Sequence, residues 1–197
     1  MSRALIVVDV QNDFCPGGAL AVAEGDQIVA GINAMMADFD AVILTQDWHP
    51  AGHSSFASSH AGKAPFELID MPYGPQVLWP DHCIHGTDGA AFHADLDTRA
   101  DLIIRKGFRP QIDSYSAFFE NDQSTPTGLE GYLRTRGITD LTMVGLALDF
   151  CVSFSAVDAA RLGFQVTVDR AHCRAIDMDG SLTAAETAMR DAGVTLI

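Results

Sequence analysis

Aspartate and histidine gather in the segment TQDWHPAGHSSF, residues 45–56, which contains Asp47, His49 and His53. Asp47 and His49 stand two positions apart, so their side chains point to the same side of an extended chain. A carboxylate and an imidazole placed in this way can share one cation, and His53 can return to it after a turn. Asp-x-His is also common by chance, and most loop histidines are only solvated. The segment therefore predicts part of a metal site that needs a further ligand.

A second segment, LWPDHCIHGTDGAAFH, offers that ligand through His82, His85 and His93. Aspartate, histidine and water are borderline to hard ligands, which suit Zn, Fe or Mn without choosing among them. Cys83 could ligate as well, although a buried and inert thiol is the better account of it. Together the two segments predict one divalent metal ion.

A third segment, VGLALDFCVSFSAVDAARLG, places Cys151 after an apolar run and at the start of a predicted helix. Free N–H groups and the positive end of a helix dipole favour a thiolate there and can hold an oxyanion. From position alone, a small buried residue is the better interpretation of Cys151. A thiol nucleophile also needs a base and a cation. Asp9 and Lys106, each at the end of a predicted strand, can supply both without a histidine.

The elements that would position these residues alternate between short apolar runs and amphipathic segments. The apolar runs lack polar alternation and read as buried parallel strands: 4–10, 41–45, 102–105, 141–145, 165–169 and 194–197. Helices are predicted between them at about 26–39, 127–136, 151–162 and 183–192, the second opened by a capping box from Thr127 to Glu130. We expect one α/β domain over residues 1–197, with six parallel strands and helices on both faces.

Two long segments without regular structure remain, roughly residues 46–97 and 107–125. Loops of this length in a compact domain are usually functional. In open α/β sheets, ligands bind outside the carboxyl ends of the strands, which is where the candidate residues lie. The pattern predicts that they converge at this edge of the sheet.

Composition limits the partners and the compartment. The net charge of −14 and the lack of a basic stripe argue against nucleic acid. The apolar run 4–8 is broken by Asp9, which makes it too short for a signal segment or a membrane span. The four cysteines are scattered along the chain, as expected in a reducing compartment. We expect a cytoplasmic protein that acts on a small molecule.

Five segments, in this order and spacing, resemble the nicotinamidases of the isochorismatase-like cysteine hydrolase superfamily: IVVDVQNDFCPGGAL, TQDWHP followed by HSSF, LWPDHC, RKG and VGLALDFCV. The resemblance spans roughly residues 4–175. It implies hydrolysis of nicotinamide to nicotinate and ammonia in NAD salvage, with pyrazinamide as a further substrate. The implied fold is a parallel sheet flanked by helices.

Carried over residue by residue, the resemblance implies a catalytic triad of Asp9, Lys106 and Cys151. In this mechanism Asp9 takes the thiol proton and a nicotinoyl thioester forms on Cys151, which water then hydrolyses. The implied oxyanion hole consists of N–H groups at a cis peptide between Leu146 and Ala147, together with the N–H of Cys151.

The resemblance also implies a metal site and an aromatic pocket. The implied metal ligands are Asp47, His49 and His82, and His53 matches a position that ligates in some members but not in others. The metal binds the pyridine nitrogen and so positions the ring. The implied substrate-binding residues are Phe14, Trp79, Tyr115 and Leu146. Two departures from the family pattern, Leu148 and Phe150, bear on substrate preference rather than on the chemistry.

Three other functions remain open at this point. A related cysteine amidase acting on another carboxamide or on an N-carbamoyl compound would share the triad. A metallohydrolase would use the Asp/His cluster to activate water and would not need Cys151. A binding or scaffold domain of the same fold would have no use for the triad, whose three residues are all present. The sequence does not decide between a monomer and a homo-oligomer.

Overall fold

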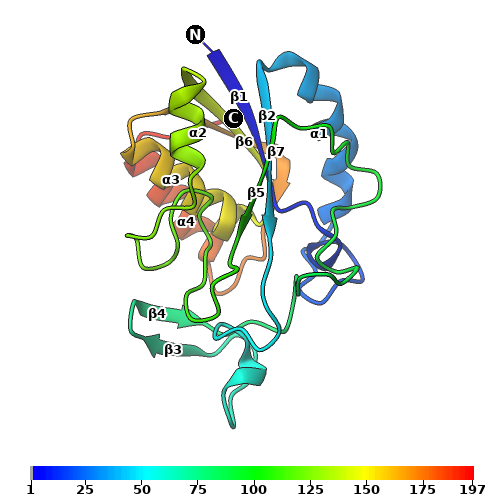
Figure 1. The fold of residues 1–197 in the computed structure, drawn as a ribbon, viewed down its shortest axis with the longest axis vertical. Coiled ribbons are helices and arrows are strands. Elements are labelled where there is room, and N and C mark those ends of the chain that lie inside the picture. Colours follow the sequence, from blue (N-terminus) through cyan, green and yellow to red (C-terminus); the bar gives the residue numbers. More distant parts are fainter. Residues whose placement is uncertain (1) are drawn as a thin grey trace.

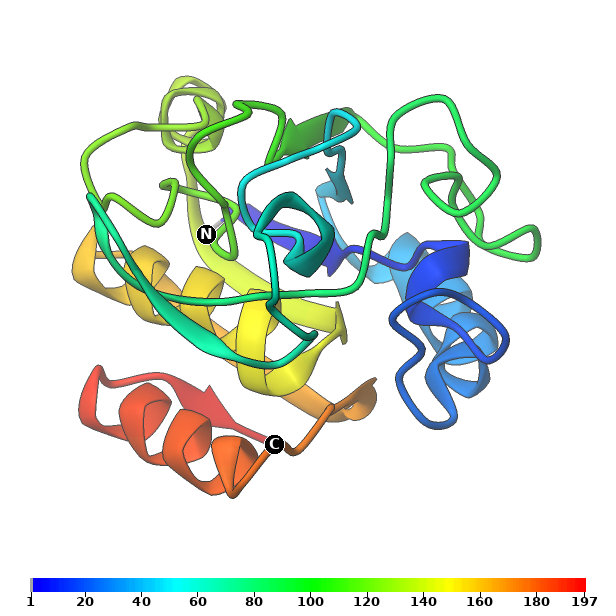
Figure 2. The same cartoon turned by 90° about the horizontal axis from the view of Figure 1, so that it is seen from below.

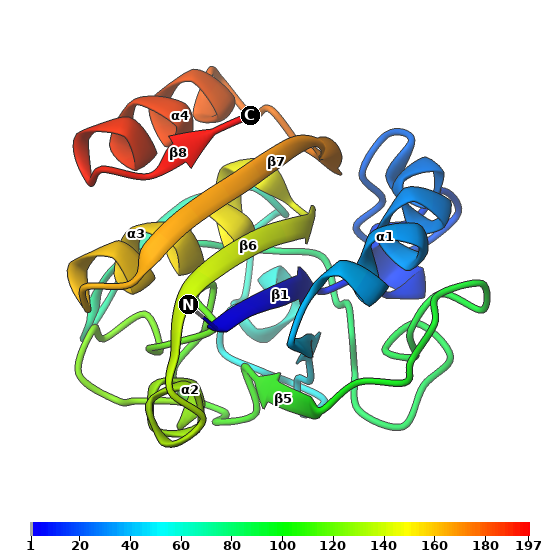
Figure 3. The ribbon, with the colours of Figure 1, turned by 90° about the horizontal axis from the view of Figure 1, so that it is seen from above.

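A computed structural model describes residues 2–197, and its centre is a six-stranded parallel sheet (Figures 1 and 3). The strand order is β5-β2-β1-β6-β7-β8, and every neighbouring pair is parallel. The strands are β1 (Ser2–Val8), β2 (Ala41–Asp47), β5 (Leu102–Lys106), β6 (Ile138–Leu146), β7 (Gln165–Arg174) and β8 (Thr195–Leu196). The six parallel strands expected from the apolar runs are therefore confirmed.

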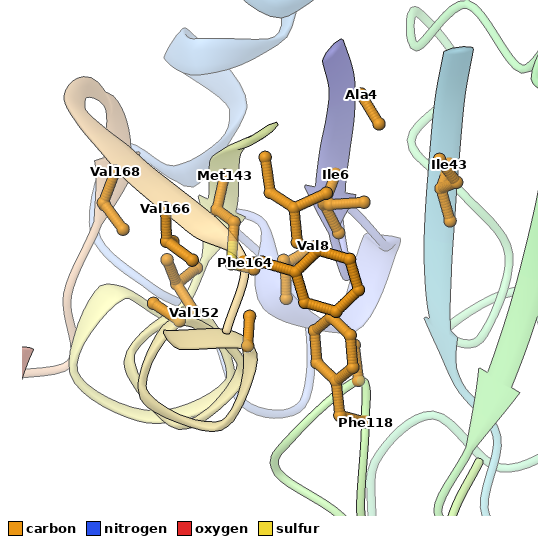
Figure 4. Packing of buried hydrophobic residues seen from close by; sticks show 14 of the residues in the cluster. Ala4, Ile6, Val8, Ile43, Phe118, Met143, Val152, Phe164, Val166 and Val168 are labelled. Atoms are coloured by element: carbon orange, nitrogen blue, oxygen red, sulfur yellow. The ribbon is translucent and has the colours of Figure 1, made fainter. Parts of the chain in front are cut away.

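Helices cover both faces of this sheet, as the sequence predicts. They are α1 (Val29–Met35), α2 (Leu129–Thr135), α3 (Ser153–Arg161) and α4 (Ser181–Asp191). Neighbouring residues of β1 point to opposite faces of the sheet. Ile6 packs in a hydrophobic cluster with residues of α2, α3 and α4, whereas Leu5 packs in a second cluster with residues of α1. Figure 4 shows the first cluster, where Ile6, Phe118 and Phe164 fill the space beneath the sheet.

The first and third predicted helices differ from expectation in their form. The segment predicted as one helix over 26–39 is divided into a 3-10 turn (Gly25–Ile28), α1 and a second 3-10 turn (Met36–Asp38). The segment predicted as a helix from 151 begins earlier, as a π-helical turn (Leu148–Val152) that continues into α3. Cys151 therefore lies inside a π-helical turn, a feature that often occurs at functional sites.

The capping box predicted for α2 is wrong. The helix begins at Leu129, its N-cap is Gly128 with φ +103°, and no side chain of the N-cap position bonds to the helix. The hydroxyl of Thr127 donates to Ala117 O at 2.5 Å and accepts from Leu129 N at 3.3 Å, while Glu130 pairs with Arg134. Thr127 therefore joins the helix to the preceding loop rather than closing a box with Glu130.

The long segment predicted as a loop over 46–97 contains a small antiparallel hairpin of β3 (Leu68–Met71) and β4 (Gly74–Val77). Each strand has only four residues, and β4 contains Pro75, which explains why no strand pattern stands out in the sequence. Figure 2, which views the molecule from below, shows the hairpin and the surrounding irregular chain lying across the lower end of the sheet, where the strands end. Two short 3-10 turns, Asn12–Phe14 and Ala57–Ser59, lie in the loops of this end.

Among residues 2–197, none of the helices has the length and apolar character that crossing a membrane requires.

Candidate active site

The expected catalytic side chains meet where the strand order reverses. Numbered along the chain, the six strands of the sheet run 3-2-1-4-5-6, so the direction of winding changes between β1 and β6. Asp9 follows β1, and Cys151 follows β6 after the turn at Ala147. Lys106 ends β5, two strands away from β1, and its side chain reaches across β2.

Asp9, Lys106 and Cys151 are in contact and shielded from solvent. Lys106 Nζ lies 2.8 Å from Asp9 Oδ2 and 3.5 Å from Cys151 Sγ, and it donates to Ser114 O at 2.9 Å. Asp9 and Lys106 are at most 1 % exposed and Cys151 is 8 % exposed. Thr45 donates to the other carboxylate oxygen of Asp9 at 2.5 Å. Within residues 2–197, Asp9 Oδ2 has no hydrogen-bond donor besides its contact with Lys106 Nζ, so it can take a proton from a neighbour.

Burial and the charges of neighbouring groups together set the pKa values of these three side chains. It raises the pKa of the Cys151 thiol well above its ordinary value, although the Lys106 ammonium acts in the opposite direction. It also raises the pKa of Asp9, again against the effect of Lys106. Burial alone would lower the pKa of Lys106, but the carboxylates of Asp47 and Asp9 outweigh it and hold this pKa well above the usual value. The resting site is therefore a neutral thiol beside a basic carboxylate and a permanent cation, rather than a free thiolate at a helix end.

The turn that carries Cys151 folds around the carbonyl of Ala147. Phe150 N and Val152 N both donate to Ala147 O at 3.1 Å. The peptide bond between Leu146 and Ala147 is cis, as the resemblance implies. Ala147 and Cys151 both line the pocket described below, which places the two backbone positions expected to form the oxyanion hole beside the thiol.

Asp47, His49 and His82 form a buried cluster next to the triad, with ligand atoms within 4.8 Å of one another. Nε2 of His49 lies 2.9 Å from Asp47 Oδ2, and Nε2 of His82 lies 3.3 Å from the same oxygen. The other ring nitrogens are engaged, since Nδ1 of His49 donates to Gly107 O and Nδ1 of His82 donates to Pro80 O, both at 2.8 Å.

These carbonyl contacts fix the orientation of both imidazoles and leave the two Nε2 atoms facing one carboxylate oxygen. A second partner on the remote ring nitrogen is the usual arrangement of metal-binding histidines. The pKa of His49 is raised, because Asp47 outweighs the effect of burial, so a proton is attracted to the same position as a cation. One carboxylate and two imidazoles fit a divalent ion such as Zn, Fe or Mn.

His53 lies beside this cluster but its two nitrogens have other partners. Its Nδ1 accepts from Ser55 N at 3.1 Å, and its Nε2 donates to Arg109 O at 2.8 Å. Its ring lies 4.5 Å from that of His49, centroid to centroid. His53 also belongs to a second group of candidate ligands, with His49 and Asp113, whose ligand atoms lie within 4.8 Å of one another.

The other candidates of the second loop lie outside the cluster. The ring of His85 packs near that of Trp48, and Nδ1 of His93 accepts from Asp95 N at 3.2 Å. Cys83 is fully buried, and burial raises its pKa well above the ordinary value, in agreement with an inert thiol. All four cysteines are free thiols.

A narrow pocket opens over Cys151 and reaches the metal-ligand cluster. Three of the four residues expected to bind substrate line it: Phe14, Trp79 and Tyr115. The fourth, Leu146, is fully buried in the core on the α1 face. The rings of Trp79 and Tyr115 meet edge to face, and Tyr115 OH accepts from Trp79 Nε1 at 3.2 Å. Such walls suit a flat aromatic ring.

Sequence reasoning missed several residues of this pocket. The lining residues that it did not name are Leu20, Asp113, Ser114 and Ile176, and Phe150, which it named only as a departure from the family pattern, lines the pocket as well. Phe150 had a local signal, since it precedes Cys151, and its ring lies 5.0 Å from Trp79. Leu20 and Ile176 reach the pocket from loops distant in sequence and carry no local signal. Asp113 stands 3.9 Å from His49 Nε2 and accepts from Gln76 at 2.8 Å.

Comparisons with known proteins agree with this arrangement. A family model described as the isochorismatase domain matches residues 3–197. The chain is 56% identical over 195 residues to a nicotinamidase of Acinetobacter baylyi, covering 98% of this chain and 91% of the relative. It is 44% identical over 200 residues to a nicotinamidase of Escherichia coli, covering 98% of this chain and 93% of the relative.

Solved structures give the same result. A structure of an Acinetobacter baumanii nicotinamidase and pyrazinamidase matches with a TM-score of 0.98 and 55% identity, covering 100% of this chain and 95% of the other. A pyrazinamidase of Pyrococcus horikoshii, solved in complex with zinc, matches with a TM-score of 0.80 and 33% identity, covering 100% of this chain and 99% of the other.

Proposed function

The chain belongs to the isochorismatase family, and from this premise we propose that it hydrolyses nicotinamide to nicotinate and ammonia through a thioester on Cys151. Its enzyme class is that of its relatives, a nicotinamidase hydrolase. One observation carries the mechanism: the Lys106 ammonium contacts both the Asp9 carboxylate and the thiol of Cys151, which lines an aromatic pocket. Pyrazinamide is a second expected substrate, because a relative from Mycobacterium tuberculosis is described as both a nicotinamidase and a pyrazinamidase.

Acylation begins with transfer of the thiol proton from Cys151 to Asp9. The raised pKa of Asp9 makes it a better base than an ordinary aspartate, and Lys106 stabilises the thiolate that forms. The sulfur attacks the carboxamide carbon, and the negative oxygen is held by the backbone N–H groups of Ala147 and Cys151. Asp9 then returns the proton to the leaving nitrogen, ammonia departs, and a nicotinoyl thioester remains on Cys151.

Deacylation uses the same groups in reverse. Asp9 accepts a proton from water, the resulting hydroxide attacks the thioester carbon, and the carbon–sulfur bond breaks. The thiolate of Cys151 recovers its proton from Asp9, and nicotinic acid leaves and gives up its own proton to solvent to become nicotinate.

The residues of the Asp/His cluster fit one divalent ion, Zn, Fe or Mn, held by Asp47, His49 and His82. When bound, such an ion would supply a Lewis-acidic contact for the ring nitrogen of a pyridine carboxamide. The distance between the ion position and the Cys151 thiol is set by Asp47 and Lys106. Asp47 Oδ1 lies 3.2 Å from Lys106 Nζ, which in turn lies 3.5 Å from Cys151 Sγ. In this proposal His53 packs against His49 and keeps it in place, and it does not itself bind the ion.

The test is ammonia release from nicotinamide, pyrazinamide, benzamide and N-carbamoylsarcosine. We expect turnover of the first two and little turnover of benzamide, which lacks the ring nitrogen. Replacing Cys151 with alanine should reduce turnover to background, while Cys173→Ala, which also removes one buried sulfur, should stay active. A folded Cys151→Ala variant with near wild-type rate would contradict the thioester mechanism and support a metallohydrolase. Preferred turnover of N-carbamoylsarcosine would instead indicate a different amidase.

A further inference from the structure

The mechanism leaves one buried carboxylate of the nucleophile turn without a role. Asp149 lies two positions before Cys151 and is 4 % exposed. It is absent from the lining of the substrate pocket, so its side chain does not act on the substrate directly. A carboxylate is costly to bury unless hydrogen bonds satisfy its oxygens, so the donors around it are informative.

All of those donors come from one distant segment. Asp149 Oδ1 accepts from Ile176 N at 3.0 Å, and Oδ2 accepts from Asp177 N at 2.8 Å and from Ser181 Oγ at 2.5 Å. Within residues 2–197, no side chain from outside residues 176–181 donates a hydrogen bond to this carboxylate. Hydrogen bonds to a carboxylate are shorter and stronger than those between neutral groups. Asp177, whose N–H is one of these donors, lies in the left-handed region at φ +55°.

The segment that Asp149 holds is a wall of the pocket. Residues 176–180 are irregular and connect β7 to α4, and Ile176 lines the pocket together with Phe150 and Cys151. Other contacts of this segment are the pairing of Arg174 with Leu146 between β7 and β6, the apolar packing of Ile176 against the cluster on the α1 face, and the ion pair of Arg174 with Glu24 at 3.5 Å. Glu24 is 62 % exposed in that pair, and exposed ion pairs contribute little. Asp149 therefore supplies the buried hydrogen bonds that hold the backbone at Ile176 and Asp177, in addition to the apolar packing of the Ile176 side chain.

We infer that Asp149 is a positioning residue that joins the nucleophile turn to the Ile176 wall and so limits the pocket to a single flat ring. This inference rests on the proposed amidase function of the same pocket. Loss of the three bonds releases Ile176, while Cys151 keeps its contact with Lys106. The expected consequence is relaxed selection of ring size rather than loss of the chemistry.

The kinetic test compares nicotinamide with quinoline-3-carboxamide, which carries a second fused ring. In Asp149→Asn the ratio of kcat/KM for the larger amide to that for nicotinamide should rise about tenfold, the scale at which apolar pockets discriminate. Ile176→Ala should raise the ratio similarly, and the double variant should add little to either single variant. Asp158→Asn is the matched control, because Asp158 is a buried aspartate of α3 without a hydrogen bond to residues 176–181. An unchanged ratio in a folded Asp149→Asn variant would overturn the inference.

A second measurement does not depend on activity. Hydrogen exchange of a peptide spanning residues 175–182 reports the amides of Ile176 and Asp177. Their exchange should be faster in Asp149→Asn and, more weakly, in Ser181→Ala, which keeps the carboxylate and loses one bond. It should be unchanged in Asp158→Asn. Equal exchange in wild type and Asp149→Asn would overturn the positioning role, whereas wild-type protein without amidase activity would overturn the proposed function alone.

Discussion

The carboxylate of Asp47 belongs to two groups of residues at once. Its Oδ1 lies 3.2 Å from Lys106 Nζ, and its Oδ2 faces the Nε2 atoms of His49 and His82. The side chain of Gln11 fixes the backbone beneath it, donating to Asp47 O at 2.8 Å and accepting from Asp47 N at 2.7 Å. Because both oxygens belong to one planar group, the cation position and the lysine beside the thiol are held at a fixed separation.

The ligand set makes a prediction about metal affinity. Replacing His82 with alanine removes one of two imidazoles, so affinity for Zn²⁺ should fall by more than the ~10–100-fold typical of residues that only support a ligand. His53→Gln, which removes a support of His49, should stay within that smaller range. Equilibrium dialysis with elemental analysis measures both. Equal losses in the two variants would count against the distinction drawn between His82 and His53.

The triad makes a prediction about additivity. Asp9→Asn and Lys106→Ala should each lower kcat about 10³-fold or more, because proton transfer and thiolate stabilisation act on one sulfur. In a Cys151→Ala background the same changes should have almost no further effect on the residual rate. Single-turnover ammonia release provides the measurement. Independent, multiplying losses would mean that the three residues do not form one catalytic unit.

At the scale of elements, the strands and the residues at their ends could be predicted from the sequence. A parallel strand buried on both faces is a short apolar run, so its signal is local, and its carboxyl end locates residues such as Asp9 and Lys106. The β3–β4 hairpin, the π-helical turn and the contacts of Ile176 could not be predicted in this way. They depend on what a segment meets after folding, as when Asp149 binds backbone N–H groups 27 and 28 residues further along the chain.

The β1–β6 pair gives a prediction for stability. Gly145 in β6 has φ +120°, and a Cβ there would lie 2.8 Å from Val8 N and 2.9 Å from Val8 C, deep in the sheet. Gly145→Ala should therefore lower the free energy of unfolding by about 3 kcal/mol. Gly163→Ala is the control, because Gly163 has φ +88° but open space around it, and backbone strain alone should cost about 1 kcal/mol. Urea titration followed by circular dichroism measures both, and equal losses would show that close approach to β1 is unimportant.

For the whole molecule, we propose that residues 1–197 form a single domain, with the β3–β4 hairpin as part of it. Gln76 of β4 is 1 % exposed and donates to Asp113 Oδ2 at 2.8 Å, and Asn121 donates to Gln76 Oε1 at 3.1 Å. Trp79, which follows β4, is likewise tied to the loop before β3, since Trp79 N donates to Ser55 O at 2.8 Å and Trp79 O accepts from Ala57 N at 2.9 Å. The hairpin thus shares buried polar contacts with the loops that complete the pocket.

This arrangement predicts one unfolding transition that responds as a unit to metal removal. Far-UV circular dichroism reports the unfolding of the sheet and helices. Fluorescence of Trp48 and Trp79 reports the unfolding of the long segment over the strand ends. If the chain is one cooperative domain, the two unfolding curves should coincide. A divalent ion at 100 times its dissociation constant adds about 2.7 kcal/mol to the native state, which for a chain of this length raises Tm by roughly 5–10 °C. Chelation should remove that increment from both curves equally. If only the fluorescence transition moved on chelation, the long segment would be a separate, metal-dependent unit. The reason is that metal binding stabilises only those parts of the structure that unfold together with the metal site.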